Sequence, residues 1–487
     1  MFQLFHLIQG QGSSLQKQLR EQIATAILNG NIPLDKPLPS SRKLAQQLAI
    51  ARNTVVLAYE HLLDDGYLIA RERRGYFVNP DILEGQVKAL VRPIDLEKKL
   101  PNWEQRFKIR PSTQSNIIKA QDWQTYDYPF IYGQFDAKIF PSVNWRECCR
   151  DAVSDSAVND WAVDSLDNDD PRLIEQIRTR LLPRRGVWAS SNQILVTVGS
   201  QQSLFILVQL LLDKKSVLGI EDPGYVDVRN IAELHQCPIK TLSIDQGGLI
   251  IDDQLKDCDL IYTTPSHQCP TTVTMPLQRR YELLRRACDD DFLIIEDDYE
   301  SETNFDTKPN PALKSLDNND RVIYIGSLSK TLAPGLRLGY VVASEQLIEE
   351  ARALRRLMIR HPAANNQRAA AFFLERGYHD ALIMNIARNY QSRWRAMDEA
   401  LTKHLPGSHD IPTFGGSCYW VQGPKDLNAQ DLQKRAKQES ILIEPGHIHF
   451  YDSTSMNNYF RLGFSSISTD KIEPGIEKLV RIIKSMV

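Results

Sequence analysis

The sequence predicts an α/β protein in two parts, a small helical head that ends in a hairpin and a much larger domain built on a mostly parallel sheet. At 487 residues the chain is too long for one ordinary domain. Three runs with helical periodicity occupy residues 14–66, and from Tyr126 onward strand-like and helix-like runs alternate. The stretch between them is polar and holds several prolines. We therefore expect a head (1–80), a linker (81–125) and a body (126–487).

Composition limits what the chain can be. Hydrophobic residues make up 42% and charged residues 24%, as in a soluble globular protein. Residues 1–80 hold nine Lys and Arg against six Asp and Glu, so the head carries +3 and the rest of the −3 chain carries −6, a balance that suits a polyanionic partner for the head. The seven cysteines form no metal-ligand pattern, and we expect no metal. With no export signal and no apolar run long enough for a bilayer, we expect a cytoplasmic protein without membrane contact.

The head is expected to begin with a helix. SLQKQLREQIATAILNG has apolar residues on one face, Ser13 or Ser14 as its cap and Gly30 as its stop. A proline-rich turn leads to the short helix SRKLAQQLAI and then to the longer helix ARNTVVLAYEHLLDDGYL, in which Val55, Val56 and Leu57 help pack the helix down. YLIARERRGYFV predicts two short strands joined by a charged turn. This order is that of a winged helix-turn-helix.

Candidate DNA contacts lie at two helix starts and at the hairpin turn. Backbone N–H groups, hydroxyls and guanidinium groups at a helix start suit phosphates and base edges. The helix starts supply Ser40, Ser41, Arg42, Arg52, Asn53 and Thr54. The wing tip supplies Arg71, Arg73, Arg74 and Gly75. Residues 12–78 resemble the winged head of GntR-family repressors, which implies double-stranded promoter DNA as the partner. The alternative is a helical protein-interaction domain with a solvated charged face.

The body alternates apolar runs with amphipathic ones. We expect strands in NQILVTV, SVLGIED, DLIYTTP, FLIIEDD, RVIYIGS and RLGYVVAS, and helices in QQSLFILVQLLLDK and PLQRRYELLRRAC. A parallel sheet of this kind binds ligands at the carboxyl ends of its strands. After about Leu354 a long helix is expected to lead into a smaller α+β domain that ends at Val487.

Reactive and polar side chains follow several of these strands. Lys330 lies in a loop just after YIGS. FLIIEDD ends in two acids, of which Asp297 is preferred and Asp298 is the alternative, and Tyr299 follows them. Tyr225 comes just after a strand that Pro223 breaks. Further hydroxyl, amide and guanidinium groups stand at Ser200, Gln201, Ser327, Ser329 and Arg337.

Together these are the parts of a pyridoxal 5′-phosphate site. Lys330 supplies the amine for an imine, Asp297 an acid for the pyridine nitrogen, and Tyr299 a hydroxyl for the phenolic oxygen. Tyr225 is the aromatic side chain that stacks on the ring. The phosphate cup is assigned to the helix start at Ser200 and Gln201, together with Ser327, Ser329 and Arg337.

In this order, the residues resemble a fold-type I aminotransferase of class I over 126–487, and head plus body resemble the MocR/GabR group of bacterial transcription regulators. The resemblance implies a mostly parallel, seven-stranded-type sheet with a smaller α+β C-terminal domain, and a homodimer. It also implies that Arg461, in YFRLGFSS, binds the carboxylate of an amino-compound effector.

Two segments depart from the family pattern. TPSHQCPTTVTMP replaces the usual Asn-Pro-Thr-Gly-like loop, with Cys269 before the proline and Thr272 in place of the glycine, which leaves His267, Gln268 or no residue to supply the polar contact. SLDNDDPRLIEQI lacks the aromatic-and-glycine stretch of active aminotransferases. Both departures weaken the case for transamination more than that for cofactor binding.

We therefore expect a pyridoxal-phosphate-dependent, DNA-binding transcription regulator that senses an amino compound, or the cofactor itself, through aldimine chemistry at Lys330. Aminotransferase activity is expected to be vestigial at most. The alternative is an active aminotransferase with an accessory DNA-binding domain, in which Lys330 would shuttle the α-proton. The recognition helix and basic wing favour the regulator, because an enzyme has no use for them.

Overall fold

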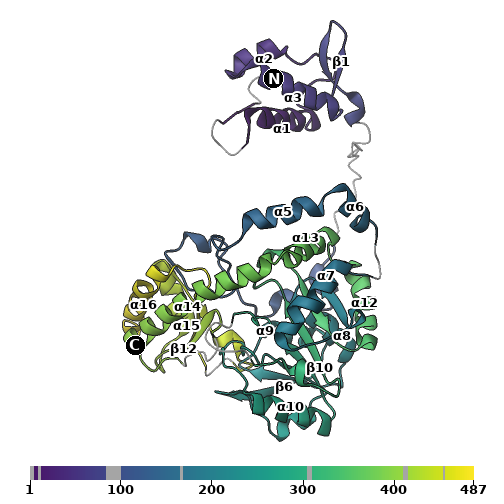
Figure 1. Cartoon of the computed structure of the whole chain (residues 1–487). Coiled ribbons are helices and arrows are strands. Elements are labelled where there is room, and N and C mark those ends of the chain that lie inside the picture. Colours follow the sequence, from purple (N-terminus) through teal and green to yellow (C-terminus); the bar gives the residue numbers. More distant parts are fainter. Residues whose placement is uncertain are drawn as a thin grey trace. The chain divides into compact units, whose positions relative to one another are not determined.

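The computed structural model describes residues 5–8, 13–83, 100–164, 168–303, 310–409, 415–452 and 456–487. The chain forms two compact units, Met1–Trp103 and Glu104–Val487 (Figure 1). The sequence-based division set the body's start at residue 126, within the second unit. Residues 84–99 of the expected linker lie outside the described residues.

The head has the predicted order of three helices and a hairpin. Its elements are α1 (Leu15–Leu28), α2 (Ser41–Leu48), α3 (Arg52–Asp64), β1 (Leu68–Arg71) and β2 (Gly75–Val78). Ser14 is the cap of α1, where its side chain accepts a hydrogen bond from the backbone N–H of Lys17. The two strands are antiparallel, with Leu68 opposite Val78.

Apolar side chains from all three helices form the core of the head. Leu19 and Ile23 of α1, Leu44 of α2 and Val55 of α3 are each fully buried. Leu57 was expected to help pack α3 but is 40% exposed. It lies two residues from Val55, which is about 200° around a helix, and so it points to the opposite side.

The body is built on an eight-stranded sheet in the order β4-β11-β10-β9-β8-β5-β6-β7. Its strands are β4 (Ile194–Thr197), β5 (Leu218–Asp222), β6 (Ile239–Asp245), β7 (Gly248–Leu249), β8 (Leu260–Thr263), β9 (Leu293–Asp297), β10 (Val322–Ser327) and β11 (Gly339–Val342). Strands β6, β5, β8, β9 and β10 run parallel, whereas β11 is antiparallel to both β10 and β4. The mostly parallel sheet is thus confirmed. The strand beyond the seven of the family pattern is the two-residue β7, which turns back on β6.

Helices cover both faces of this sheet (Figure 1). One face packs on α8 (Ser200–Leu211), α9 (Val226–Leu234) and α12 (Glu345–Ile359), and the other packs on α10 (Leu277–Asp289) and α11 (Leu313–Leu316). Because side chains alternate along a strand, neighbouring residues serve opposite faces: Ile294 joins the α10 cluster and Ile295 the α8 cluster. Further helices are α5 (Ser142–Ala152), α6 (Asp155–Trp161), α7 (Pro171–Gln176) and α13 (Ala364–Glu375).

A smaller α+β region completes the body, as expected. The long helix that leads into it is α14 (Tyr378–His404), which begins later than Leu354, a residue that lies inside α12. The region contains β12 (Cys418–Gln422), β14 (Glu444–Pro445) and β15 (Tyr459–Gly463) in one antiparallel sheet, with α15 (Ala429–Gln438) and α16 (Thr469–Lys484). A parallel pair, β13 (Ile441–Leu442) and β3 (Tyr128–Pro129), ties it to the start of the body.

Part of the expected linker packs on the body. After the short α4 (Trp103–Arg106), the amide of Gln114 donates a hydrogen bond to the carbonyl oxygen of Asn230, and the Asn230 amide donates to the carbonyl oxygen of Ser115. Gln114 looked like a solvated linker residue in the sequence, but its amide bonds to a backbone group of the body. None of the helices that the structure describes is both long and apolar enough to cross a membrane.

Candidate functional site

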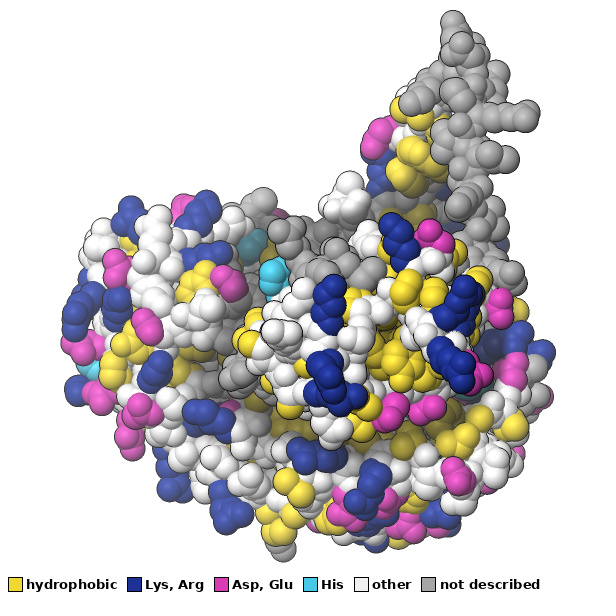
Figure 2. Space-filling view, turned by 90° about the horizontal axis from the view of Figure 1, so that it is seen from above, with side chains coloured by type: hydrophobic (Ala, Val, Ile, Leu, Met, Phe, Trp, Pro, Cys, Tyr) yellow, Lys and Arg dark blue, Asp and Glu magenta, His cyan; other side chains and the backbone are white. Residues whose placement is uncertain are grey.

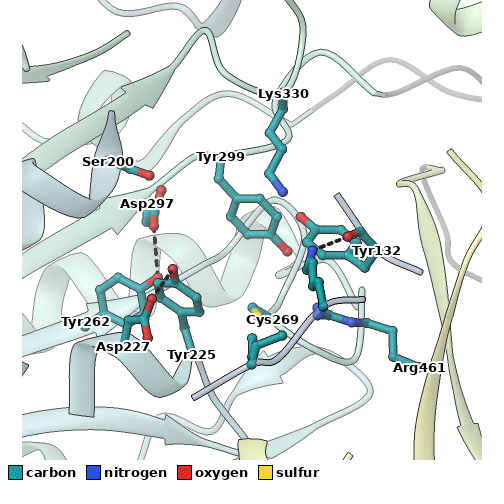
Figure 3. A pocket seen from close by; sticks show the side chains of 12 residues that line it. Tyr132, Ser200, Tyr225, Asp227, Tyr262, Cys269, Asp297, Tyr299, Lys330 and Arg461 are labelled. Atoms are coloured by element: carbon teal, nitrogen blue, oxygen red, sulfur yellow. Dashed lines mark hydrogen bonds between the residues drawn. The ribbon is translucent and has the colours of Figure 1, made fainter. Parts of the chain in front are cut away.

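A cavity of about 270 Å³ opens at the carboxyl ends of the parallel strands (Figure 3). Its walls come from β8, from the segments that follow β4, β5, β9 and β10, and from β15 of the smaller region. The lining residues are Ile117, Lys119, Tyr132, Ser200, Tyr225, Asp227, Tyr262, Cys269, Asp297, Tyr299, Lys330 and Arg461. Six of them, Ser200, Tyr225, Asp297, Tyr299, Lys330 and Arg461, are residues singled out from the sequence.

Lys330 reaches the cavity from the loop after β10. Its amine lies 4.0 Å from the ring centre of Tyr132, over the ring face. Burial lowers the pKa of this amine, although the neighbouring Glu300 carboxylate opposes the shift. A lysine with a lowered pKa is more often neutral, and therefore a better nucleophile.

Asp297 ends β9 with one carboxylate oxygen bonded and the other open. The Tyr262 hydroxyl donates a 3.0 Å hydrogen bond to Asp297 Oδ2. Oδ1 is buried and has no hydrogen-bond partner among the described residues. Burial raises the pKa of Asp297 to about 7, against the effect of the Tyr262 hydrogen bond. A buried, half-paired acid of this kind suits a protonated ring nitrogen.

Asp298, the alternative acid, is engaged elsewhere. Its Oδ2 accepts hydrogen bonds from Arg185 Nε at 2.7 Å and from the Tyr324 hydroxyl at 2.9 Å. Burial raises the pKa of Asp298, but the charge of Arg185 and the hydrogen bonds outweigh it and hold the pKa below its usual value. Asp298 does not line the cavity, so the geometry favours Asp297.

Tyr225 stands at the start of α9 with its ring in the cavity wall. Its hydroxyl is 3.0 Å from Gln201 Oε1 and 2.9 Å from Asp227 Oδ2, and these two acceptors share its one proton. Burial, and then the Asp227 carboxylate, raise the pKa of Tyr225 well above its usual value, so the ring stays neutral. Gln201 therefore acts through Tyr225, and its side chain does not line the cavity.

The loop at His267 to Cys269, which departs from the family pattern, holds Tyr299 through a backbone carbonyl group. The Tyr299 hydroxyl donates a 2.9 Å hydrogen bond to the carbonyl oxygen of His267. The His267 ring does not line the cavity. The Gln268 amide donates to Glu221 Oε2 and to two backbone carbonyl oxygens. Cys269 is the residue of this loop that faces the cavity, so neither predicted substitute supplies a side chain to its wall.

The residues predicted to hold the phosphate lie at the start of α8 and at or after the end of β10, and Gln201, Ser327, Ser329 and Arg337 are not among those that line the cavity. Ser200, the first residue of this helix, lines the cavity. Arg337 packs against the preceding Gly199, where a Cβ atom would lie 2.8 Å from Arg337 Nη2. The backbone N–H of Ser329 donates to Ser327 Oγ at 3.2 Å. The buried Ser329 Oγ itself has no partner in the described part of the chain.

Arg461, the candidate for an effector carboxylate, is already paired. Its Nε and Nη2 both lie 2.9 Å from Glu444 Oε2, and both residues are buried. The guanidinium carbon is 4.0 Å from the ring centre of Tyr132, whose ring also contacts Lys330. Nothing in the residue types or their spacing indicates Glu444 as the partner of Arg461.

The residues present fit pyridoxal phosphate. Two buried polar atoms, Asp297 Oδ1 and Ser329 Oγ, lack partners within the described ranges, and the cofactor's ring nitrogen and phosphate are the groups that would satisfy them. Sequence reasoning missed several lining residues: Ile117, Lys119, Tyr132, Asp227 and Tyr262. Tyr262 stands near a strand end and could have been found there, whereas Lys119 lay in a stretch read as linker.

The predicted DNA contacts lie at the positions expected in the head. Ser40 is the cap of α2 and accepts a hydrogen bond from the backbone N–H of Lys43. Arg52 Nε donates to Ser41 Oγ at 3.4 Å, which links the starts of α2 and α3. Most of the predicted contacts are exposed, with Ser41 and Thr54 intermediate; the exposed ones are Ser40, Arg42, Arg52, Asn53, Arg73 and Gly75.

The wing is a tight turn between β1 and β2. The backbone N–H of Arg74 donates to the Arg71 carbonyl oxygen at 2.9 Å. Arg73 has a positive φ angle of 59°. Gly75 has a φ angle of 100°, a backbone conformation that favours glycine. The Arg71 guanidinium lies 4.5 Å from the ring centre of Phe77.

On the visible face in Figure 2, Lys and Arg are interspersed with Asp and Glu, consistent with a net charge of only −3.

Two family models match the chain. Residues 15–78 match the gntR family of bacterial regulatory proteins, and residues 163–479 match the class I and II aminotransferases. Among solved structures, the kynurenine aminotransferase of Pyrococcus horikoshii, in complex with PMP, is 27% identical with a TM-score of 0.71, over 79% of this chain and 98% of that one. The LysN α-aminoadipate aminotransferase of Thermus thermophilus is 25% identical with the same TM-score of 0.71, over 79% and 99% of the two chains.

Full-length relatives combine the same two parts. The HTH-type transcriptional regulator TauR of Rhodobacter capsulatus is 38% identical over 99% of both chains. The probable rhizopine catabolism regulatory protein MocR of Rhizobium meliloti is 28% identical over 96% of this chain and 93% of its own length. The similarity therefore runs through head and body together.

Proposed function

The chain belongs to the MocR/GabR-type transcription regulators, in which a gntR-family head precedes a domain of the class I and II aminotransferases, and from this premise we propose that its body binds pyridoxal phosphate and senses an amino compound. One observation carries the proposal. The Lys330 amine and the unpaired Asp297 Oδ1 border the same cavity. That pairing of a nucleophilic amine with a buried acid is what the cofactor requires.

Pyridoxal phosphate supplies an aldehyde that condenses with amines and a ring nitrogen that attracts electrons when protonated. Lys330 would hold the cofactor through its amine, and an amine on the effector would compete with it. Asp297 would keep the ring nitrogen protonated, and Tyr225 would cover the ring. The phosphate would be held by the backbone N–H groups of Ser200 and Gln201 and by Ser327, Ser329 and Arg337.

The head reads double-stranded promoter DNA through α3 and the wing. An effector can change DNA binding only if it favours one arrangement of the protein over another, because a ligand with equal affinity for both shifts nothing. We propose that the regulator works as a homodimer in the cytoplasm, so that two heads contact two half-sites.

Absorption spectra of the purified protein test the cofactor assignment. We expect a visible absorption band in the wild type and its loss in Lys330→Ala, because the band requires an imine to the lysine. Lys138→Ala removes an exposed lysine outside the cavity and should keep the band. A band that survives in Lys330→Ala would sink the assignment.

Footprinting on the protein's own promoter region, with and without amines, tests the link to DNA. We expect amino compounds that shift the absorption band to change the footprint of the wild type. The same compounds should leave the footprint of Lys330→Ala unchanged. A footprint that no band-shifting compound changes would refute the sensor. Fast, repeated transamination would favour an enzyme.

A further inference from the structure

A second amine lines the cavity, and it comes from the segment before β3. Lys119 Nζ donates a hydrogen bond to the Tyr132 carbonyl oxygen and lies 3.7 Å from Glu444 Oε1. A Cβ atom at Gly133 would lie 2.8 Å from Lys330 Nζ and 3.3 Å from Lys119 Nζ. Both amines therefore border the same small space. The proposed function gives Lys330 a role there and leaves Lys119 without one.

The charges at this end of the cavity do not balance. Arg461 and Lys119 are both cations, and Glu444 is the carboxylate that contacts both of them. Glu444 Oε2 is bonded to Arg461, whereas Oε1 is buried and accepts no hydrogen bond from any described residue. One carboxylate neutralises one cation, so an excess positive charge remains when Lys119 is protonated.

The position of the charged Lys119 amine destabilises the folded protein. Burial lowers the pKa of its amine to about 8, Glu444 opposes the shift, and the charges of Lys330 and Arg461 reinforce it. At neutral pH the amine is mostly protonated. An enclosed charge that its surroundings do not fully neutralise is more typical of a binding site than of packing.

We infer that Lys119 and Arg461 together bind the anionic group of the effector, and that Lys119 selects small amino compounds bearing such a group over amines that lack one. The inference rests on the proposed function, because it requires the effector's amine to reach Lys330. Glu444 competes with the effector for the same two cations. Its removal should therefore strengthen the selectivity that Lys119 provides.

Paired ligands of equal length test this selectivity. The full-length protein loaded with pyridoxal phosphate is titrated with glycine and β-alanine, each against its own amide, by the shift of the cofactor band and by calorimetry. In the wild type we expect the better-binding acid to exceed its amide in affinity by about tenfold or more, as for a charge-assisted contact in a partly enclosed site.

Substitutions assign the selectivity to Lys119. Lys119→Met should reduce the acid-to-amide affinity ratio by about tenfold, Lys119→Arg should restore most of it, and Glu444→Gln should raise it. Lys108→Met removes an exposed lysine of the same segment and should leave the ratio unchanged.

The outcomes separate this inference from the proposed function. A band that responds to none of the four ligands contradicts the sensor itself. A wild type that responds to acid and amide equally, or a Lys119→Met protein that keeps the full ratio, overturns the role of Lys119. If Lys119→Met does not retain the cofactor, Glu444→Gln decides, because an unchanged or lower ratio in that variant also overturns it.

Discussion

The hydroxyl of Tyr262 donates a 3.0 Å hydrogen bond to Asp297 Oδ2, within a cavity where the other oxygen of that carboxylate has no partner among the described residues. The bond stabilises the ionised acid in a buried place that otherwise favours the protonated one. Tyr262 therefore positions and tunes the group proposed to hold the cofactor's ring nitrogen.

Tyr262→Phe should weaken pyridoxal-phosphate binding by about tenfold, because a hydrogen bond to a charged group contributes roughly 1.5–3 kcal/mol. Without the donor, the pKa of Asp297 rises further and less of the carboxylate is ionised. Titration of the cofactor-free protein, followed by the absorption band, measures the affinity. Tyr324→Phe is the matched control, since it removes a hydroxyl from Asp298 outside the cavity. Equal losses in the two variants would argue against a specific role for Tyr262.

Ser329→Ala should separate stability from cofactor binding. The Ser329 hydroxyl is buried without a partner in the described structure, so its removal should leave the cofactor-free protein as stable as before, or up to about 1 kcal/mol more stable. Cofactor affinity should fall, because the phosphate loses a donor. Thermal melting and cofactor titration give the two values. Ser203→Ala breaks a 2.8 Å hydrogen bond to Thr197, so it should lower the stability of the cofactor-free protein and leave its cofactor affinity unchanged. Unchanged cofactor affinity in Ser329→Ala would remove Ser329 from the phosphate site.

Much of this arrangement could be predicted from the sequence, because periodicity and strand ends carry the information. All six expected strands of the body form. The strand β6 was missed because its run, IKTLSID, alternates with polar residues near the sheet edge. Asp297 was preferred over Asp298 from the sequence, and the structure supports that preference, because Arg185 and Tyr324 both bond Asp298 whereas Tyr262 bonds one oxygen of Asp297.

Contacts between segments far apart in the sequence could not be predicted. The pairing of Arg461 with Glu444 joins β15 to β14, and neither residue type nor spacing indicates it. Lys119 lies among charged and polar residues, where a lysine carries no signal of burial. Its position in the cavity depends on the fold of the whole body.

Arg52→Ala should reduce the affinity for the specific promoter by about tenfold, because a side chain that contacts base edges contributes roughly 1–3 kcal/mol of discrimination. Arg52 is exposed at the first turn of α3, beside Ser41. Binding assays compare the promoter with unrelated DNA at fixed salt. Lys17→Ala removes the same charge from α1 and should have little effect. If Arg52→Ala loses equal affinity for both DNAs, Arg52 contacts phosphates and not bases.

The Lys119 amine predicts a pH-dependent stability with a definite sign. Its folded-state pKa of about 8 lies below the ordinary lysine value of 10.5, chiefly through burial. Between these pH values the unfolded chain holds a proton that the folded protein has released, so the free energy of unfolding rises with pH. Below pH 8 the folded protein holds the protonated Lys119 amine in full, and this destabilises it by at most about 3 kcal/mol.

Lys119→Met should therefore stabilise the cofactor-free protein relative to wild type at pH 7, and the gain should shrink as pH rises toward 10. Melting temperatures of the two proteins at both pH values give the difference, in which the titration of lysines outside the cavity cancels. Lys330 does not cancel in this way, because the charges of the two amines lower each other's pKa; loss of Lys119 relieves Lys330 as well, which adds to the gain at pH 7. A gain that is the same at pH 7 and pH 10 would mean that the Lys119 amine is not a buried charge in the folded protein.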